Sequence, residues 1–97
     1  MMVQGKWNVT IKTPVGDKTG TLDLIVDGAR LTGSLYDADH IAAINDGKIQ
    51  GNKLTWSATI TGPMRLNLKF TATVEADRID GTARHLLGSA QFSGSRV

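Results

Sequence analysis

Apolar and polar residues alternate strictly from residue 64 to residue 74. Apolar side chains take every second position of this segment: Met64, Leu66, Leu68, Phe70, Ala72 and Val74. A period of two is typical of a β-strand with one buried side and one solvent-facing side. Residues 7–11, 22–26 and 54–60 repeat the pattern, and no comparable window shows the spacing of an amphipathic helix. The sequence therefore predicts an all-β protein.

Turn-forming residues divide the chain at regular intervals. Asp27-Gly28 and Gly51-Asn52 are typical hairpin turns, and similar polar or glycine-containing segments lie near residues 14, 38, 62, 76 and 87. These turns predict strands at about 4–13, 18–27, 30–37, 40–50, 53–61, 64–74, 78–84 and 88–96. Asp46-Gly47 interrupts the fourth strand, where we expect a β-bulge; a true turn is the alternative.

The connections between these strands are too short for parallel crossovers, so neighbouring strands should pair antiparallel. An up-and-down barrel of eight strands removes both sheet edges and is the expected fold, with a two-sheet β-sandwich as the second choice. The 97 residues are expected to form one domain, 1–97.

The two ends of the chain support a closed barrel. Gly5-Lys6-Trp7 begins the first strand and Arg96 ends the last, so closure would place the Arg96 guanidinium over the Trp7 ring. A G-x-W motif with a late arginine resembles the closing signature of the calycin superfamily. Together with the stretches 5–27, 45–54 and 92–96, it resembles a small lipocalin-like β-domain that occurs alone in bacteria or fused to flavin-dependent oxidoreductases and hydrolases. The resemblance implies a calycin-like barrel and says little about function.

Composition excludes several classes of protein. The absence of cysteine rules out disulfides, thiolate metal sites and a cysteine nucleophile. A net charge of +2 is too small to indicate a nucleic-acid partner. Both tryptophans and both phenylalanines fall on the buried side of their strands, where they cannot stack on bases. No segment is apolar and long enough to span a membrane, and no signal peptide is recognisable, so we expect a cytoplasmic protein. No cofactor-binding motif is present.

Alternate turns of a meander lie at the same end of the barrel, and one end gathers the chemically active side chains. It carries both histidines, His40 and His85, with Tyr36, Asp37 and Arg84 close to them in the chain. Loops on a rigid scaffold are where functional residues concentrate, so this end is the predicted mouth.

Strand alternation turns His40 and His85 toward the interior. Two imidazoles at an apolar mouth could exchange protons with a bound molecule near neutral pH. Asp39 is the expected third catalytic residue, orienting one imidazole. Six residues are expected to contact the ligand: Leu35, Tyr36, Asp37, Trp56, Arg84 and Leu87. Two alternatives remain: both histidines are solvated loop residues, or they join Asp37 and Asp39 around a divalent metal, although no metal is expected.

The favoured function is therefore binding of a small, largely apolar organic molecule, with metal-free isomerase, lyase or cyclase chemistry at His40 and His85 as its extension. The alternative is a non-catalytic binding, accessory or oligomerisation domain, including a homodimer. A filled interior would favour the accessory or oligomerisation domain, because it leaves no pocket for a ligand.

Overall fold

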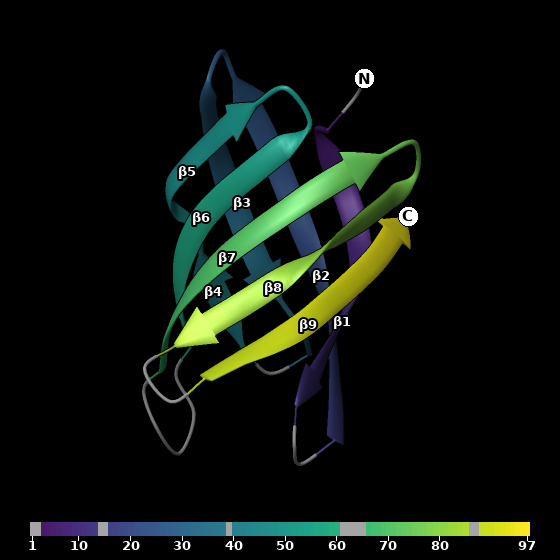
Figure 1. Ribbon diagram of the computed structural model, residues 1–97, viewed down its shortest axis with the longest axis vertical. Helices are drawn as coiled ribbons and strands as arrows, with labels where there is room; N and C mark the ends of the chain where they lie inside the picture. The colour runs from purple at the N-terminus through teal and green to yellow at the C-terminus, as the bar shows by residue number, and fades with distance from the viewer. Residues whose placement is uncertain (1–2, 14–15, 39, 61–65, 86–87) are drawn as a thin grey trace.

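The computed structural model describes residues 3–13, 16–38, 40–60, 66–85 and 88–97. All regular structure in these ranges is strand, so the predicted all-β fold is confirmed (Figure 1). The strands are β1 (Gly5–Thr13), β2 (Gly16–Asp27), β3 (Arg30–Tyr36), β4 (Ile41–Ala43), β5 (Asn45–Gln50), β6 (Lys53–Ile60), β7 (Leu66–Glu75), β8 (Arg78–His85) and β9 (Gly88–Arg96). Within the described ranges, no helix is long and apolar enough to cross a membrane.

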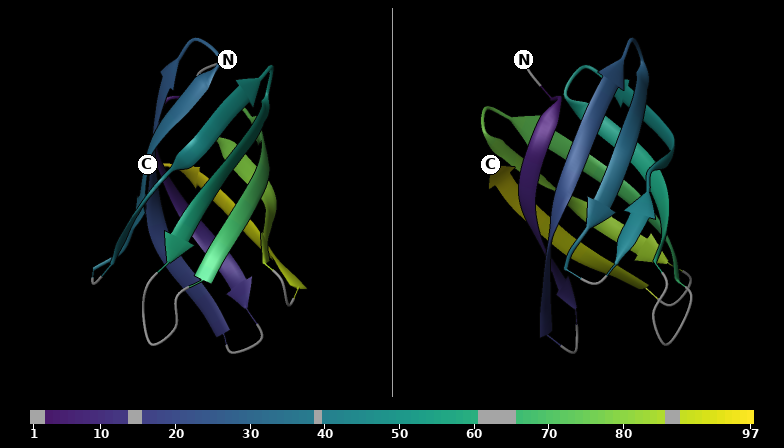
Figure 2. Two further views of the ribbon diagram at one scale, coloured as in Figure 1. Left: turned by 90° about the vertical axis from the view of Figure 1, so that its left-hand side faces the viewer. Right: turned by 180° about the vertical axis from the view of Figure 1, so that it is seen from behind.

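The strands form one closed antiparallel barrel. Consecutive strands pair with each other, except β4 with β5, and β1 pairs with β9 to close the sheet. Both β4 and β5 pair with β3, so these two strands share one place in the wall and the barrel has eight strand positions. The strand directions alternate around the wall (Figure 2). The up-and-down barrel expected from the sequence is thus confirmed in preference to a two-sheet sandwich.

A β-bulge divides the fourth strand position. The register between β5 and β6 shifts between Asn45 and Lys48, and Asp46 adopts a φ of 52°. Gly47 packs so closely on the backbone of Leu31 that a side chain there would collide with the Leu31 carbonyl oxygen. The bulge predicted at Asp46-Gly47 is confirmed, and the alternative of a turn that adds a hairpin is wrong.

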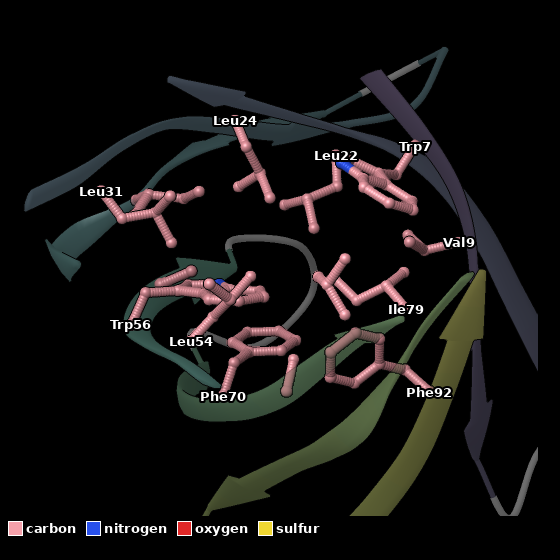
Figure 3. Packing of buried hydrophobic residues seen from close by; sticks show 14 of the residues in the cluster. Trp7, Val9, Leu22, Leu24, Leu31, Leu54, Trp56, Phe70, Ile79 and Phe92 are labelled. Carbon is pink, nitrogen blue, oxygen red and sulfur yellow. The ribbon is translucent and has the colours of Figure 1, made fainter. Parts of the chain in front are cut away.

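Alternate residues of every strand point into the barrel interior. Figure 3 shows Leu22, Leu24 and Trp7 on one wall, with Trp56, Phe70 and Phe92 on the other. The alternation expected for residues 64–74 holds where it is described: Phe70, Ala72 and Val74 are buried, Leu68 is half-buried, and Lys69 and Thr71 are exposed. Met64, Arg65 and the side chain of Leu66 lie outside the described residues.

The closing contact has the predicted form. Trp7 and Arg96 face each other in the β1–β9 ladder, and the guanidinium carbon of Arg96 lies 4.3 Å from the centre of the Trp7 ring. Arg96 Nη1 also donates a hydrogen bond of 2.9 Å to the carbonyl oxygen of Gln4. The Arg96 Nε atom lies 3.4 Å from Asp77 Oδ1, so one side chain ties the last strand to the start of the chain and to the β7–β8 turn.

Candidate functional site

The two ends of the barrel differ in the connections that they carry. Short turns join β2 to β3, β5 to β6 and β7 to β8 at one end, which we call the closed end. Four connections, from β1 to β2, β3 to β4, β6 to β7 and β8 to β9, lie at the opposite end, the loop end (Figure 1), whereas β4 continues into β5 through Ile44 within the wall. His40 lies in the β3–β4 connection and His85 is the last residue of β8, so the topology puts both at the loop end.

The described inward side chains are mostly large at the closed end, whereas the loop end includes four alanines. The closed-end interior holds bulky residues that are at most 1% exposed: Trp7, Leu24, Leu31, Leu54, Val74 and Ile79. At the loop end, four strands each place an inward alanine within two residues of the strand terminus. These alanines, called here the alanine ring, are Ala42, Ala58, Ala83 and Ala90. Among the described residues, the half-buried Ile11, Leu35 and Leu68 line this end together with the alanines, and Leu35 and Leu68 pair directly with Ala42 and Ala58.

An aromatic cluster lies next to the alanine ring, further from the loop end. The rings of Trp56 and Phe70 stack with centres 5.0 Å apart, and Phe92 meets both rings edge-on. Trp56 precedes Ala58 by two residues on β6, and Phe70 faces Ala83 across the β7–β8 ladder. A small molecule among the alanines would thus rest on an aromatic surface, which favours apolar and planar groups.

The two tryptophans of the barrel differ in how their indole N–H groups are satisfied. The Trp7 Nε1 atom donates a hydrogen bond of 3.0 Å to the carbonyl oxygen of Val3. The Trp56 side chain is equally buried, at 2% exposed, yet its Nε1 atom has no hydrogen-bond partner. A buried donor without an acceptor costs about 1–3 kcal/mol of stability, so most buried donors in native proteins have a partner. Trp56 is therefore the polar group of the interior that lacks a partner in the described structure.

His40 lies in the turn between β3 and β4. Its backbone N–H donates to Asp37 Oδ1 at 2.8 Å, and its carbonyl accepts from the Asp37 N–H at 2.9 Å. The His40 Nδ1 atom lies 3.6 Å from Asp37 Oδ1, and the imidazole is 53% exposed. Because β4 begins at Ile41, the strand alternation from which we expected an inward imidazole does not extend to His40.

His85 ends β8, two residues after the buried Ala83, and is half-buried. Its place on the inward row of β8 agrees with the strand alternation. Of the other expected ligand contacts, Leu35 is half-buried against the core, Trp56 is part of the aromatic cluster, and Arg84 is exposed. Asp39 and Leu87 lie outside the described residues.

Among the described residues, two surface grooves lie on the outer side of the barrel. The larger, of about 860 Å³, crosses β1, β2 and β9 and is lined mainly by hydroxyl and amide side chains such as Asn8, Thr21 and Ser95. Tyr36 and Asp37 line this outer groove, together with Ala38. The second groove, of about 470 Å³, follows β8 and β9 around Gln91. Neither groove is lined by His40 or His85.

A metal site was one alternative for the histidines. Among the described residues, no group of three or more histidine, aspartate or glutamate side chains is close enough to hold a metal ion. Asp39, one of the four ligands of that alternative, lies outside the described residues. The absence of a metal-binding group therefore concerns only His40, His85 and Asp37. The pair formed by His40 and Asp37 is an exposed contact within one turn.

Comparison with known proteins supports the fold. No protein-family model matches the chain, and no curated protein does. A solved structure described as a redesigned β-barrel superposes with a TM-score of 0.71 at 12% sequence identity, over 98% of this chain and 91% of that chain. At this level of identity the similarity concerns the barrel alone.

Sequence reasoning missed much of the loop-end interior. It named Trp56 as a ligand contact but did not assign Ala42, Ala58 and Ala90 to the mouth, although all three lie on the inward rows of their strands. Their position could have been read from the strand alternation together with the turn positions. The missing partner of Trp56 Nε1 had no signal in the sequence, because it depends on the side chains that the fold brings around the indole.

Proposed function

We propose that this protein is a lipocalin-like barrel that binds a small, largely apolar organic molecule inside its loop end. The observation that carries the proposal is the placement of four inward alanines near the loop end, whereas the described closed-end interior has mainly bulky side chains. Small barrels that are only structural fill their interiors with side chains at both ends, whereas binding barrels receive ligands through one mouth. The half-buried Leu35 and Leu68 supply further apolar surface there.

Adjacent residues on β4 provide a matched test of this proposal. Ala42 points inward and is 8% exposed, whereas Ala43 is exposed on the outer surface. Ala42→Leu fills the loop end and should weaken the binding of cyclohexanone at least tenfold, measured by ligand-observed NMR titration. Ala43→Leu adds the same methyl groups outside and should leave the affinity unchanged. A folded Ala42→Leu variant that binds as the wild type does would overturn the proposal.

Acid–base conversion of the bound molecule is the catalytic extension of this function. His85 is the residue that supports it best, because it ends the inward row of β8 beside the alanine ring. His40, with Asp37 against its ring, would be the second group, and Asp39 and Arg84 would assist. Exchange of the α-hydrogens of cyclohexanone for deuterium tests for such chemistry without a known substrate. Catalysed exchange should fall about 10²–10⁴-fold in His85→Ala; exchange no faster than in buffer excludes this extension for such a ketone.

Self-association is the second candidate function, and one exposed residue favours it. Ile41 is 73% exposed and pairs across β3–β4 with Tyr36 on the outer surface. A large exposed apolar side chain beside an aromatic ring is typical of a contact surface. If the chain forms a homodimer through this surface, sedimentation equilibrium should show a dimer that Ile41→Thr converts to a monomer. A monomer at all concentrations would exclude this candidate.

A further inference from the structure

The indole N–H of Trp56 identifies the chemistry of the ligand more closely. The group is a hydrogen-bond donor in an interior whose other buried side chains are apolar in the part of the chain that the structure describes. The stacked Phe70 ring fixes the plane of the indole, and the edge-on Phe92 restricts it further, so the donor cannot turn to find an acceptor elsewhere. The same barrel satisfies the other indole, that of Trp7, through the Val3 carbonyl.

We infer that the ligand of the loop end carries a hydrogen-bond acceptor, such as a ketone or ether oxygen, and that Trp56 Nε1 donates to it. This inference rests on the proposed function, because it requires a molecule inside the loop end. A purely hydrocarbon ligand would leave the donor unsatisfied, and an ionised ligand would be placed against an apolar wall with no buried charge among the described residues to balance it. The class is therefore neutral, mostly apolar molecules with one acceptor.

The position of Trp56 next to the alanine ring supports this contact. Trp56 lies two residues from Ala58 on β6, and Ala58 belongs to the alanine ring. A molecule lying among the alanines would therefore meet the indole at the floor of the site. Its acceptor would point toward the barrel centre, and its apolar part would face the mouth.

Two probes of nearly equal shape test the inference. Cyclohexanone has a carbonyl oxygen where methylenecyclohexane has a CH₂ group, so the pair isolates the acceptor. Because water also binds the ketone, the relevant quantity is the ratio of the two dissociation constants in each variant. Trp56→Phe keeps an aromatic ring and removes the donor, and should shift this ratio against the ketone by roughly 3- to 10-fold. Trp7→Phe removes the other indole donor at the closed end and should leave the ratio unchanged.

The indole N–H signals in a ¹H–¹⁵N spectrum give an independent readout. Cyclohexanone should move the Trp56 signal downfield, as a new hydrogen bond does, while the Trp7 signal stays in place. If both probes bind and Trp56→Phe leaves their ratio unchanged, or if the Trp56 signal does not respond to the ketone, the inference is wrong and the binding site stands. If neither probe binds the folded protein, the proposed function fails and the inference fails with it.

Discussion

Arg96 is the residue whose contacts join the most distant parts of this chain. Its guanidinium lies on the Trp7 ring, donates to the Gln4 carbonyl and approaches the Asp77 carboxylate. The backbone at Gly5 makes room for it, because a side chain at Gly5 would lie 2.9 Å from Arg96 Nη1. The contacts with Trp7 and Gln4 exist only when the first and last strands are paired, so Arg96 reports on closure of the barrel.

Removing this side chain should measure the stability that closure gains from it. We expect Arg96→Ala to lower the free energy of unfolding by about 1–3 kcal/mol, through loss of the cation–π contact and the hydrogen bond to Gln4. Arg78→Ala removes the same charge from an exposed pair with Asp80, which is worth about 0–1 kcal/mol. Urea unfolding of both variants provides the comparison. Equal losses would show that Arg96 contributes no more than a surface charge.

The closed-end turns suggest a stabilising change. Gly28 and Gly51, each first in a two-residue turn, have a φ of 62°, and Ala76 occupies the equivalent position with a φ of 53°. Glycine adopts such angles without the strain that alanine carries. Ala76→Gly should therefore raise the free energy of unfolding by about 0.5–1 kcal/mol, and Gly28→Ala should lower it. Thermal unfolding would show the two opposite shifts; a loss in Ala76→Gly would contradict this account of the turn.

The sequence predicted the start of a strand best where the strand follows a short turn with typical turn-forming residues. The β3 start at Arg30, the β6 start at Lys53 and the β8 start at Arg78 were predicted to the residue, because each follows a short turn with its own signal. The start of β4 was less well predicted. The hydrogen bonds between Asp37 and His40 hold the chain in a turn until Ile41, and those contacts have no signature in strand periodicity.

The bulge at Asp46-Gly47 is the element that sets how β5 joins β3. Gly47→Ala should cost about 2–4 kcal/mol, because the new methyl group collides with the backbone of Leu31 and separates the two strands. Gly51→Ala serves as the control, since it meets open space and adds only the strain of its positive φ. Hydrogen exchange provides the local readout: backbone amides of the β3–β5 pairing should exchange faster in Gly47→Ala alone. Unchanged exchange there would contradict the role assigned to the bulge.

At the scale of the whole molecule, the barrel could be predicted from the sequence and much of its interior could not. Period-two alternation and turn spacing are local properties, and they define eight strand positions and their order. Which molecules the interior can bind depends on which inward side chains of different strands lie next to each other at the same height in the barrel. The alanine ring comes from four strands, and the unpartnered indole of Trp56 follows from the surroundings of a single side chain.

The most direct test of the central claim is a methyl NMR titration of alanine-labelled protein with cyclohexanone. The alanines are distributed so that each region has its own reporter: Ala42, Ala58, Ala83 and Ala90 for the loop-end interior, Ala38 for the outer groove, and Ala29 and Ala76 for the closed end. We predict saturable shifts of the four alanines of the ring, with Ala29, Ala38 and Ala76 unchanged. Shifts confined to Ala38, shifts at the closed end, or no saturable shift at all would contradict a ligand site inside the loop end.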